Sequence, residues 1–202
     1  MSAAMPLDPS PRRYRNVERW GPVSQAFHWL IVIGIVVMAI VGLTMTGMRT
    51  SPDKVQLYAL HKSIGLTILA LVALRVVWRL FAGAPPRIET IPTWQHRIAT
   101  LAHFGLYVLL FAVPISGWVM NSASGFPLWW FGLLRVPAIA GKDHDLHELS
   151  EDVHELLFWA LIALALVHAS AAIYHHLFQR DATLERMLPR GWLRVTEDSR
   201  DV

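Results

Sequence analysis

The sequence predicts an all-α membrane protein, a four-helix transmembrane bundle. Hydrophobic residues make up 54% of the 202 residues and charged residues only 16%, against about 25% charged in an average soluble domain. Four apolar segments are each close to the roughly 20 residues that cross the hydrocarbon layer of a bilayer. These segments are too long for strands and contain no turn signals, so helices are the favoured structure.

The four expected spans cover residues 27–48, 60–81, 98–120 and 153–178. The third span contains Pro114, which a membrane helix tolerates where neighbouring groups satisfy the freed carbonyl. The second linker is proline-rich and cannot continue a helix. The long third linker contains "FPLWWFGLL", which we interpret as an interfacial segment because tryptophan favours the headgroup zone. We therefore expect a basic arm over residues 1–19, a bundle over 20–180 and a tail over 181–202.

The placement of lysine and arginine predicts the orientation of the bundle. Thirteen of the 18 basic residues lie in the N-terminal arm, around the second linker or in the tail, and five lie around the other two linkers. Basic residues favour the cytoplasmic side, so both termini are expected there. The first span is longer than the apolar region of a signal peptide, and no A-x-A-like cleavage site follows it. We expect it to be retained.

The absence of cysteine limits the cofactors that the chain can hold. It excludes disulfides, thiolate-bound iron–sulfur or zinc sites, and CxxCH haem attachment. Any metal must be bound by histidine, methionine or carboxylate. The ten histidines are therefore the residues to explain.

Four of these histidines form two pairs at matching depth. His154 and His168 are 14 residues apart on the fourth span, which places them about 21 Å apart along one face of the helix. His28, at the cytoplasmic start of the first span, matches the depth of His168, and His61, at the outer start of the second span, matches that of His154. Bis-histidine ligation between facing helices can hold haem in a bundle core. The sequence thus predicts two haems in the core, bound by His28–His168 and His61–His154. Small residues are expected to let a porphyrin approach the backbone: Gly34, Gly42, Gly65, Gly105 and Gly117.

Other assignments stay open from the residues alone. A lone histidine at a membrane interface is more often a polar anchor, which is our interpretation of His175 and His176. His103, about a turn into the third span, is the strongest competitor as a metal ligand. A small transporter that uses intramembrane histidines is a different class of function. The central turns of the spans contain almost no ionisable groups, which disfavours a proton pathway.

Seven stretches, taken in order, carry a resemblance to a known family. They are "FHWL", "LHKSIG", "LAHFGLY", "PISGWVM", "VHELL", "ALVHASAAIYHHLF" and "RDATLERMLPR". Together they resemble the bacterial cytochrome b561 family of small four-span dihaem membrane proteins, over about residues 14–190. The resemblance places the family's four haem ligands on His28, His61, His154 and His168. It implies two haem b groups, electron transfer and a multi-pass location in the bacterial inner membrane.

The resemblance also implies partners and two possible activities. Members that oxidise superoxide with quinone as acceptor suggest an oxidoreductase with a ubiquinone-type partner. The alternative is a cytochrome b subunit that relays electrons for a hydrogenase or another dehydrogenase. Membrane lipid and a small redox donor or partner dehydrogenase are expected, and nucleic acid is not. For a superoxide donor, three outer-side cations are candidates for steering the anion: Lys62, Arg135 and Lys142. Arg75 and Arg79 are candidate partners of haem propionates on the cytoplasmic side.

Overall fold

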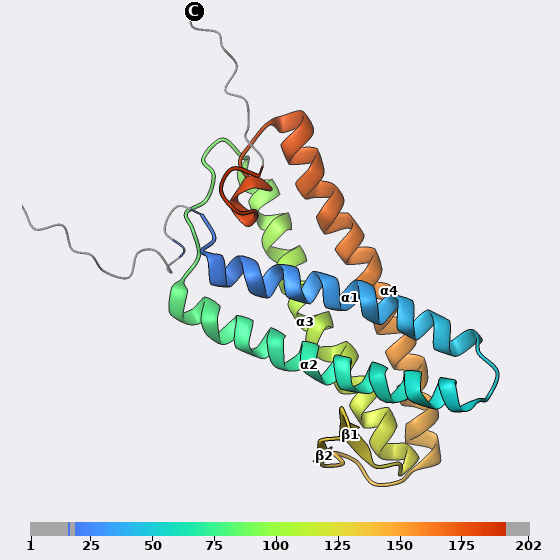
Figure 1. The fold of residues 1–202 in the computed structure, drawn as a ribbon. Helices are drawn as coiled ribbons and strands as arrows, with labels where there is room; N and C mark the ends of the chain where they lie inside the picture. Colours follow the sequence, from blue (N-terminus) through green and yellow to red (C-terminus); the bar gives the residue numbers. More distant parts are fainter. Residues whose placement is uncertain (1–15, 17–18, 193–202) are drawn as a thin grey trace, which may run out of the picture.

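The computed structural model describes residue 16 and residues 19–192, so most of the predicted arm (1–19) and the end of the predicted tail (181–202) lie outside the described residues. Four long helices dominate it: α1 (Pro22–Gly47), α2 (Pro52–Ala82), α3 (Thr93–Ser124) and α4 (His144–Tyr174). A π-helical turn, η1 (His175–Gln179), continues α4, and a 3-10 turn, η2 (Glu185–Met187), follows. Each long helix is long and apolar enough to cross a membrane. The prediction of a four-span membrane helical bundle is therefore confirmed (Figure 1).

The helices are longer than the apolar segments that predict them, because polar groups fix their ends. Helix α2 begins at Pro52, where the Ser51 hydroxyl accepts a hydrogen bond from the Lys54 amide at 3.2 Å. Helix α4 begins at His144, where the Asp143 carboxylate accepts one from the Leu146 amide at 3.0 Å. Both are N-caps that satisfy an amide left free in the first helical turn. Hydropathy alone does not register these turns.

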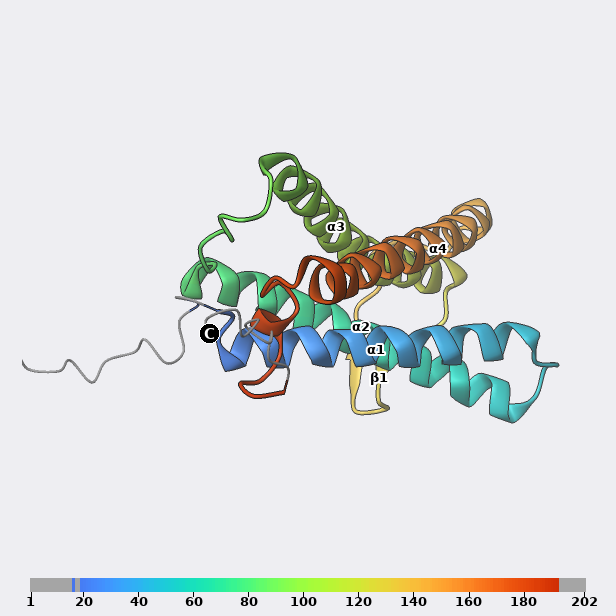
Figure 2. The same cartoon turned by 90° about the horizontal axis from the view of Figure 1, so that it is seen from above.

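The helices pair along the chain, α1 with α2 and α3 with α4. The two pairs form two layers (Figure 2), and the helices of one layer run obliquely across those of the other (Figure 1). The tightest core consists of Ile31 of α1 with Ile68 and Val72 of α2, against which residues of α3 such as Tyr107 pack. Many large apolar side chains point outward instead, which is the surface expected where helices face lipid. We call the end with the start of α1 and the end of α4 the inner end, and the opposite end the outer end.

The third linker folds at the outer end into an antiparallel hairpin, β1 (Leu128–Trp130) and β2 (Leu134–Val136). Phe131 and Gly132 are the central residues of its turn, with φ of 48° and 72°, and the Leu133 amide closes the turn onto the Trp130 carbonyl at 2.9 Å. Positive φ at both central residues is the geometry that matches the twist of hairpin strands. The interfacial stretch expected here is thus a folded element.

After α4 the chain turns back across the inner end and reaches the start of α1 (Figure 1). The Asp181 carboxylate, which begins this return, accepts hydrogen bonds from the Thr183 amide at 2.8 Å and from His175 Nδ1 at 2.5 Å. Partial burial raises the pKa of Asp181, but these hydrogen bonds lower it by more, so it lies below its usual value. Further along, Arg186 donates to the Pro86 carbonyl in the second linker at 2.7 Å. The return segment is therefore tied to the bundle at several points.

Candidate cofactor sites between facing histidines

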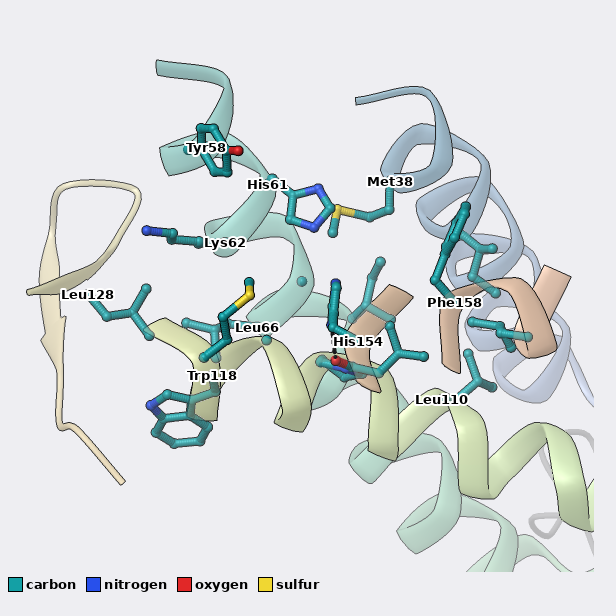
Figure 3. A pocket seen from close by; sticks show the side chains of 18 of the residues that line it. Met38, Tyr58, His61, Lys62, Leu66, Leu110, Trp118, Leu128, His154 and Phe158 are labelled. Carbon is teal, nitrogen blue, oxygen red and sulfur yellow. Dashed lines mark hydrogen bonds between the residues drawn. The ribbon is translucent and has the colours of Figure 1, made fainter. Parts of the chain in front are cut away.

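The outer pair of histidines lines a pocket between the two layers of helices. His61 comes from α2 and His154 from α4, and their ring centroids are 6.2 Å apart with the ring planes at 74°. Figure 3 shows both rings directed into the pocket. Its wall is almost entirely apolar, with Ile35, Met38, Leu66, Leu110, Phe158 and Leu161 among the lining residues. An apolar pocket with a few convergent nitrogen atoms is typical of a cofactor site.

Helix α3 fixes the orientation of the His154 ring. His154 Nδ1 lies 2.9 Å from the Val113 carbonyl and 3.0 Å from the Ser116 hydroxyl. A carbonyl can only accept, so Nδ1 carries the proton and Nε2 keeps its lone pair. The Ser116 hydroxyl itself donates to the Val113 carbonyl at 2.8 Å. This arrangement is the second contact that metal-bound histidines usually make.

Two glycines make room for the rings of the outer pair. A Cβ on Gly117 would lie 3.1 Å from His154 Cε1, and a Cβ on Gly42 would lie 3.3 Å from His61 Cε1. The Nδ1 atom of His61 is buried on the Gly42 side and has no hydrogen-bond partner among the described residues. Both rings are therefore held against a neighbouring helix by their Cε1 and Nδ1 side.

The inner pair repeats the geometry of the outer one. His28 of α1 and His168 of α4 have ring centroids 6.4 Å apart and planes at 76°. The charge of Arg75 is close enough to act on both rings, and Arg75 Nε donates to the Tyr107 hydroxyl at 3.1 Å. The inner pair thus lies beside a cation that the apolar segment of α2 holds inside the bundle.

The ring separations of both pairs fit an iron that the two histidines of each pair would hold between them. An imidazole nitrogen lies about 2 Å from a first-row metal, and the ring centroid lies about 1.1 Å behind it, so two opposed imidazoles have centroids about 6.3 Å apart. The separations of 6.2 and 6.4 Å match this value. The His103 and His168 centroids are only 5.1 Å apart, which leaves too little room for an iron between them. His103 is therefore a neighbour of the inner pair and a poor trans partner of His168.

The cations and glycines named from the sequence lie partly at the outer pocket and partly away from it. Lys62 lines the outer pocket, whereas Lys142 packs against Gly125 and Arg135 lies on β2 opposite Trp129. Within the described residues the structure thus brings one of the three proposed steering cations to the pocket. Two of the five glycines serve helix packing, since Gly34 meets Ile68 and Gly105 meets Leu164. Gly65 faces Met38 at the pocket wall, and Gly42 and Gly117 lie against the rings of His61 and His154.

Four membrane spans with two facing histidine pairs define a class of protein, the b-type membrane cytochromes, in which haem is held by axial ligands without thioether links. A family model described as prokaryotic cytochrome b561 matches residues 19–190. The chain belongs to this family. It is therefore a multi-pass bacterial membrane cytochrome of b type that takes part in electron transfer, and its family implies binding of haem b.

Curated relatives agree with this assignment over most of their length. Cytochrome b561 homolog 2 of Escherichia coli strain K12 is 33% identical over 181 residues, which cover 86% of this chain and 93% of the relative. The probable superoxide oxidase CybB of Yersinia pestis is 30% identical over 176 residues, covering 86% and 97%. Cytochrome b562 of Cereibacter sphaeroides is 29% identical over 167 residues, covering 80% and 89%.

Proposed function

We propose that the chain is a dihaem cytochrome that transfers electrons between a donor at the outer face, for which superoxide is the candidate, and a ubiquinone-type quinone in the membrane. His28 and His168 would bind the inner haem, and His61 and His154 the outer one. The observation that supports this assignment is the pair of matching histidine separations, one near each end of the bundle. Both termini would lie in the cytoplasm, so the outer site would face the opposite compartment.

Haem b bound at these sites would supply a one-electron redox centre. The chain supplies the ligands, their orientation and the surroundings. Each haem would be held by two histidines, which would favour outer-sphere electron transfer over binding of oxygen. The hydrogen bond to Val113 keeps the proton of His154 on Nδ1, and the apolar wall of the outer pocket keeps water from the ligands. Both effects would keep the histidine ligands in a single protonation state.

Charge on the chain supports the proposed donor and the direction of transfer. Lys62 at the outer pocket would attract a small anion, and the Yersinia pestis relative is named as a probable superoxide oxidase. At the inner site, the charge of Arg75 would favour the reduced state of a nearby iron. Electrons that enter at the outer site would therefore move toward the inner one. Arg135 and Lys142 would add a weaker, more distant field at the outer face.

The function is tested with purified protein in liposomes that contain ubiquinone. Superoxide generated outside should reduce first the protein and then the quinone, and superoxide dismutase should abolish both signals. Liposomes with the His61→Ala variant provide the control for direct reduction of quinone. A protein with both haems that ignores superoxide but accepts electrons from a hydrogenase or another dehydrogenase would support the alternative, a cytochrome b subunit of such an enzyme.

A further inference from the structure

Both histidine pairs bridge the crossing between the two layers of helices. His28 and His61 lie on α1 and α2, whereas both of their partners lie on α4. The close helix packing occurs mainly within each layer. In a bilayer, lipid is as apolar as the helix surfaces, so burial of apolar side chains does not drive the layers together. Van der Waals packing and hydrogen bonds between the layers must therefore set the separation of each histidine pair.

At the outer end, the hairpin between α3 and α4 reaches across to α2. The Phe131 amide donates to the Ser63 hydroxyl at 2.9 Å, and Trp130 Nε1 donates to the Thr67 hydroxyl at 3.1 Å. Ser63 is almost fully buried and lies two residues after His61. These hydrogen bonds fix the α3–α4 layer to α2 beside the outer pair. We call residues 128–136 the outer brace.

At the inner end, the segment that follows α4 reaches across to α1. Gln25 Nε2 donates to the Leu188 carbonyl at 2.9 Å, and Trp29 Nε1 donates to the Met187 carbonyl at 3.0 Å. Arg19 also donates to the carbonyls of Glu185 and Leu188. Gln25 and Trp29 lie on either side of His28 along α1, and Gln25 is buried. We call residues 181–190 the inner brace.

We propose that each histidine pair has its own brace, so that the inner brace positions His28 against His168 and the outer brace positions His61 against His154. The inner brace follows α4, and the outer brace belongs to the linker that precedes α4. Each brace forms hydrogen bonds with the α1–α2 layer beside one of the histidine ligands. The contacts that form the braces join residues far apart in the chain, such as Phe131 to Ser63 and Trp29 to Met187. The braces are thus separate devices at opposite ends of the bundle. The measurement of haem loss rests on the proposed function, whereas the measurement of distances between the helices does not.

Loss of one brace should loosen one site and leave the other unchanged. A hydrogen bond of this kind shifts an equilibrium by about fivefold when it is lost. We therefore expect haem to leave the affected site about fivefold faster per lost bond, with a change at the other site of less than about twofold. A general loss of stability would speed haem loss from both sites alike.

The experiment compares two variants with matched controls in the full chain. Trp29→Phe combined with Gln25→Leu removes two donors to the inner brace and leaves Arg19 in place. Thr67→Val removes the acceptor of the Trp130 hydrogen bond in the outer brace and leaves the bond from Phe131 to Ser63. Trp159→Phe and Thr100→Val are the controls, because both side chains are exposed and neither has a hydrogen bond to a brace among the described residues. Thr67→Ser keeps the hydroxyl and should restore the outer site. Haem loss to apomyoglobin is recorded for each site, with His154→Ala and His168→Ala backgrounds to assign the signals.

A second measurement follows the helices without relying on haem. The chain has no cysteine, so spin labels can be placed at Ile33 and Ile173 for the inner end, or at Val55 and Leu156 for the outer end. The proposal expects the inner distance distribution to broaden in the Trp29→Phe, Gln25→Leu variant and the outer one to broaden in Thr67→Val. If the inner double variant fails to accumulate, Trp29→Phe alone serves.

The outcomes separate this proposal from the proposed function. The proposal is supported if each variant speeds haem loss and broadens the helix distances only at the end of its own brace. Equal effects at both ends, or no effect at the end of the altered brace, overturn it. A protein without haem would end the proposed function, while the spin-label distances would still decide whether the braces hold the helices.

Discussion

The Nδ1 atom of His154 lies 2.9 Å from the carbonyl oxygen of Val113, the residue that precedes Pro114 within α3. Because a carbonyl cannot donate, this contact keeps the proton on Nδ1 and leaves Nε2 for a metal. Gly117, one turn later, provides the space in which the ring lies. Val113 and Gly117, the first and last residues of the stretch "VPISG", therefore form a site on the surface of α3 that holds the ring, which we call the seat for His154.

The seat for His154 should not tolerate a methyl group at residue 117. In Gly117→Ala the new Cβ would lie 3.1 Å from His154 Cε1 and 3.3 Å from Nδ1, so the ring must move. We expect outer haem to bind about tenfold more weakly, the lower end of the effect of disturbing a ligand's second contact. Haem content after titration measures this. Gly47→Ala is the control, since nothing lies within 4 Å of its new Cβ. Equal occupancy in both variants would show that the seat is unimportant.

His103 should be dispensable for haem binding. Its centroid lies 5.1 Å from that of His168, short of the roughly 6.3 Å that an iron between two opposed imidazoles requires. His103→Ala is therefore expected to keep both haems, with at most a modest spectral change at the inner site. The pyridine haemochrome assay measures the number of haems. Loss of one haem in this variant would identify His103 as a ligand and exclude the pairing of His28 with His168.

Arg75 should raise the reduction potential of the inner site. A positive charge stabilises the iron state with the extra electron, so its removal makes reduction harder. For an assumed separation of about 10 Å and an effective dielectric constant of about 20, Coulomb's law gives about 1.7 kcal/mol, or about 70 mV for one electron. In Arg75→Gln we expect the inner midpoint to fall by about this amount, measured by redox titration. Arg87→Gln, in the exposed second linker, should change neither midpoint. A fall in both midpoints after the Arg75 change would argue against a local effect.

Lys62 should control how fast an anionic donor reaches the outer site. In Lys62→Gln the rate of reduction by superoxide should fall by about fivefold at low salt and should depend less on ionic strength. Stopped-flow spectroscopy at several salt concentrations measures both effects. Arg135→Gln should have a smaller effect, because Arg135 lies on β2 outside the pocket lining. Equal effects of the two changes would favour a diffuse outer field over a local role of Lys62.

The sequence predicts what depends on local periodicity. Apolar runs of membrane length predict the four spans, and the spacing of His154 and His168 predicts that they share one helix face. In the structure the ring centroids of the two predicted pairs are 6.4 and 6.2 Å apart. The caps at Ser51 and Asp143 extend α2 and α4 beyond the apolar runs, and polar caps of this kind are visible in sequence once the helix start is sought.

The remaining features depend on contacts between distant residues. No local pattern pairs Phe131 with Ser63 or Trp29 with Met187. The hairpin turn was hidden because "WWFGLL" has apolar residues on both faces of its strands, without the alternation that predicts a half-buried strand. The distance between the rings of His103 and His168 also cannot be predicted from the sequence, because it depends on how α3 packs against α4. The best signal that sequence offered for the inner brace was the motif "RDATLERMLPR", whose structural role emerged only with the fold.

The most direct test of the central claim is a count of haem in the purified protein by the pyridine haemochrome assay, with reduced-minus-oxidised spectra. The account predicts b-type bands and two haems per chain. It also predicts one remaining haem in His154→Ala and one in His168→Ala, with different midpoints in the two variants. A protein that stays colourless with excess haem, or both variants retaining two haems, would contradict the assignment of the two histidine pairs.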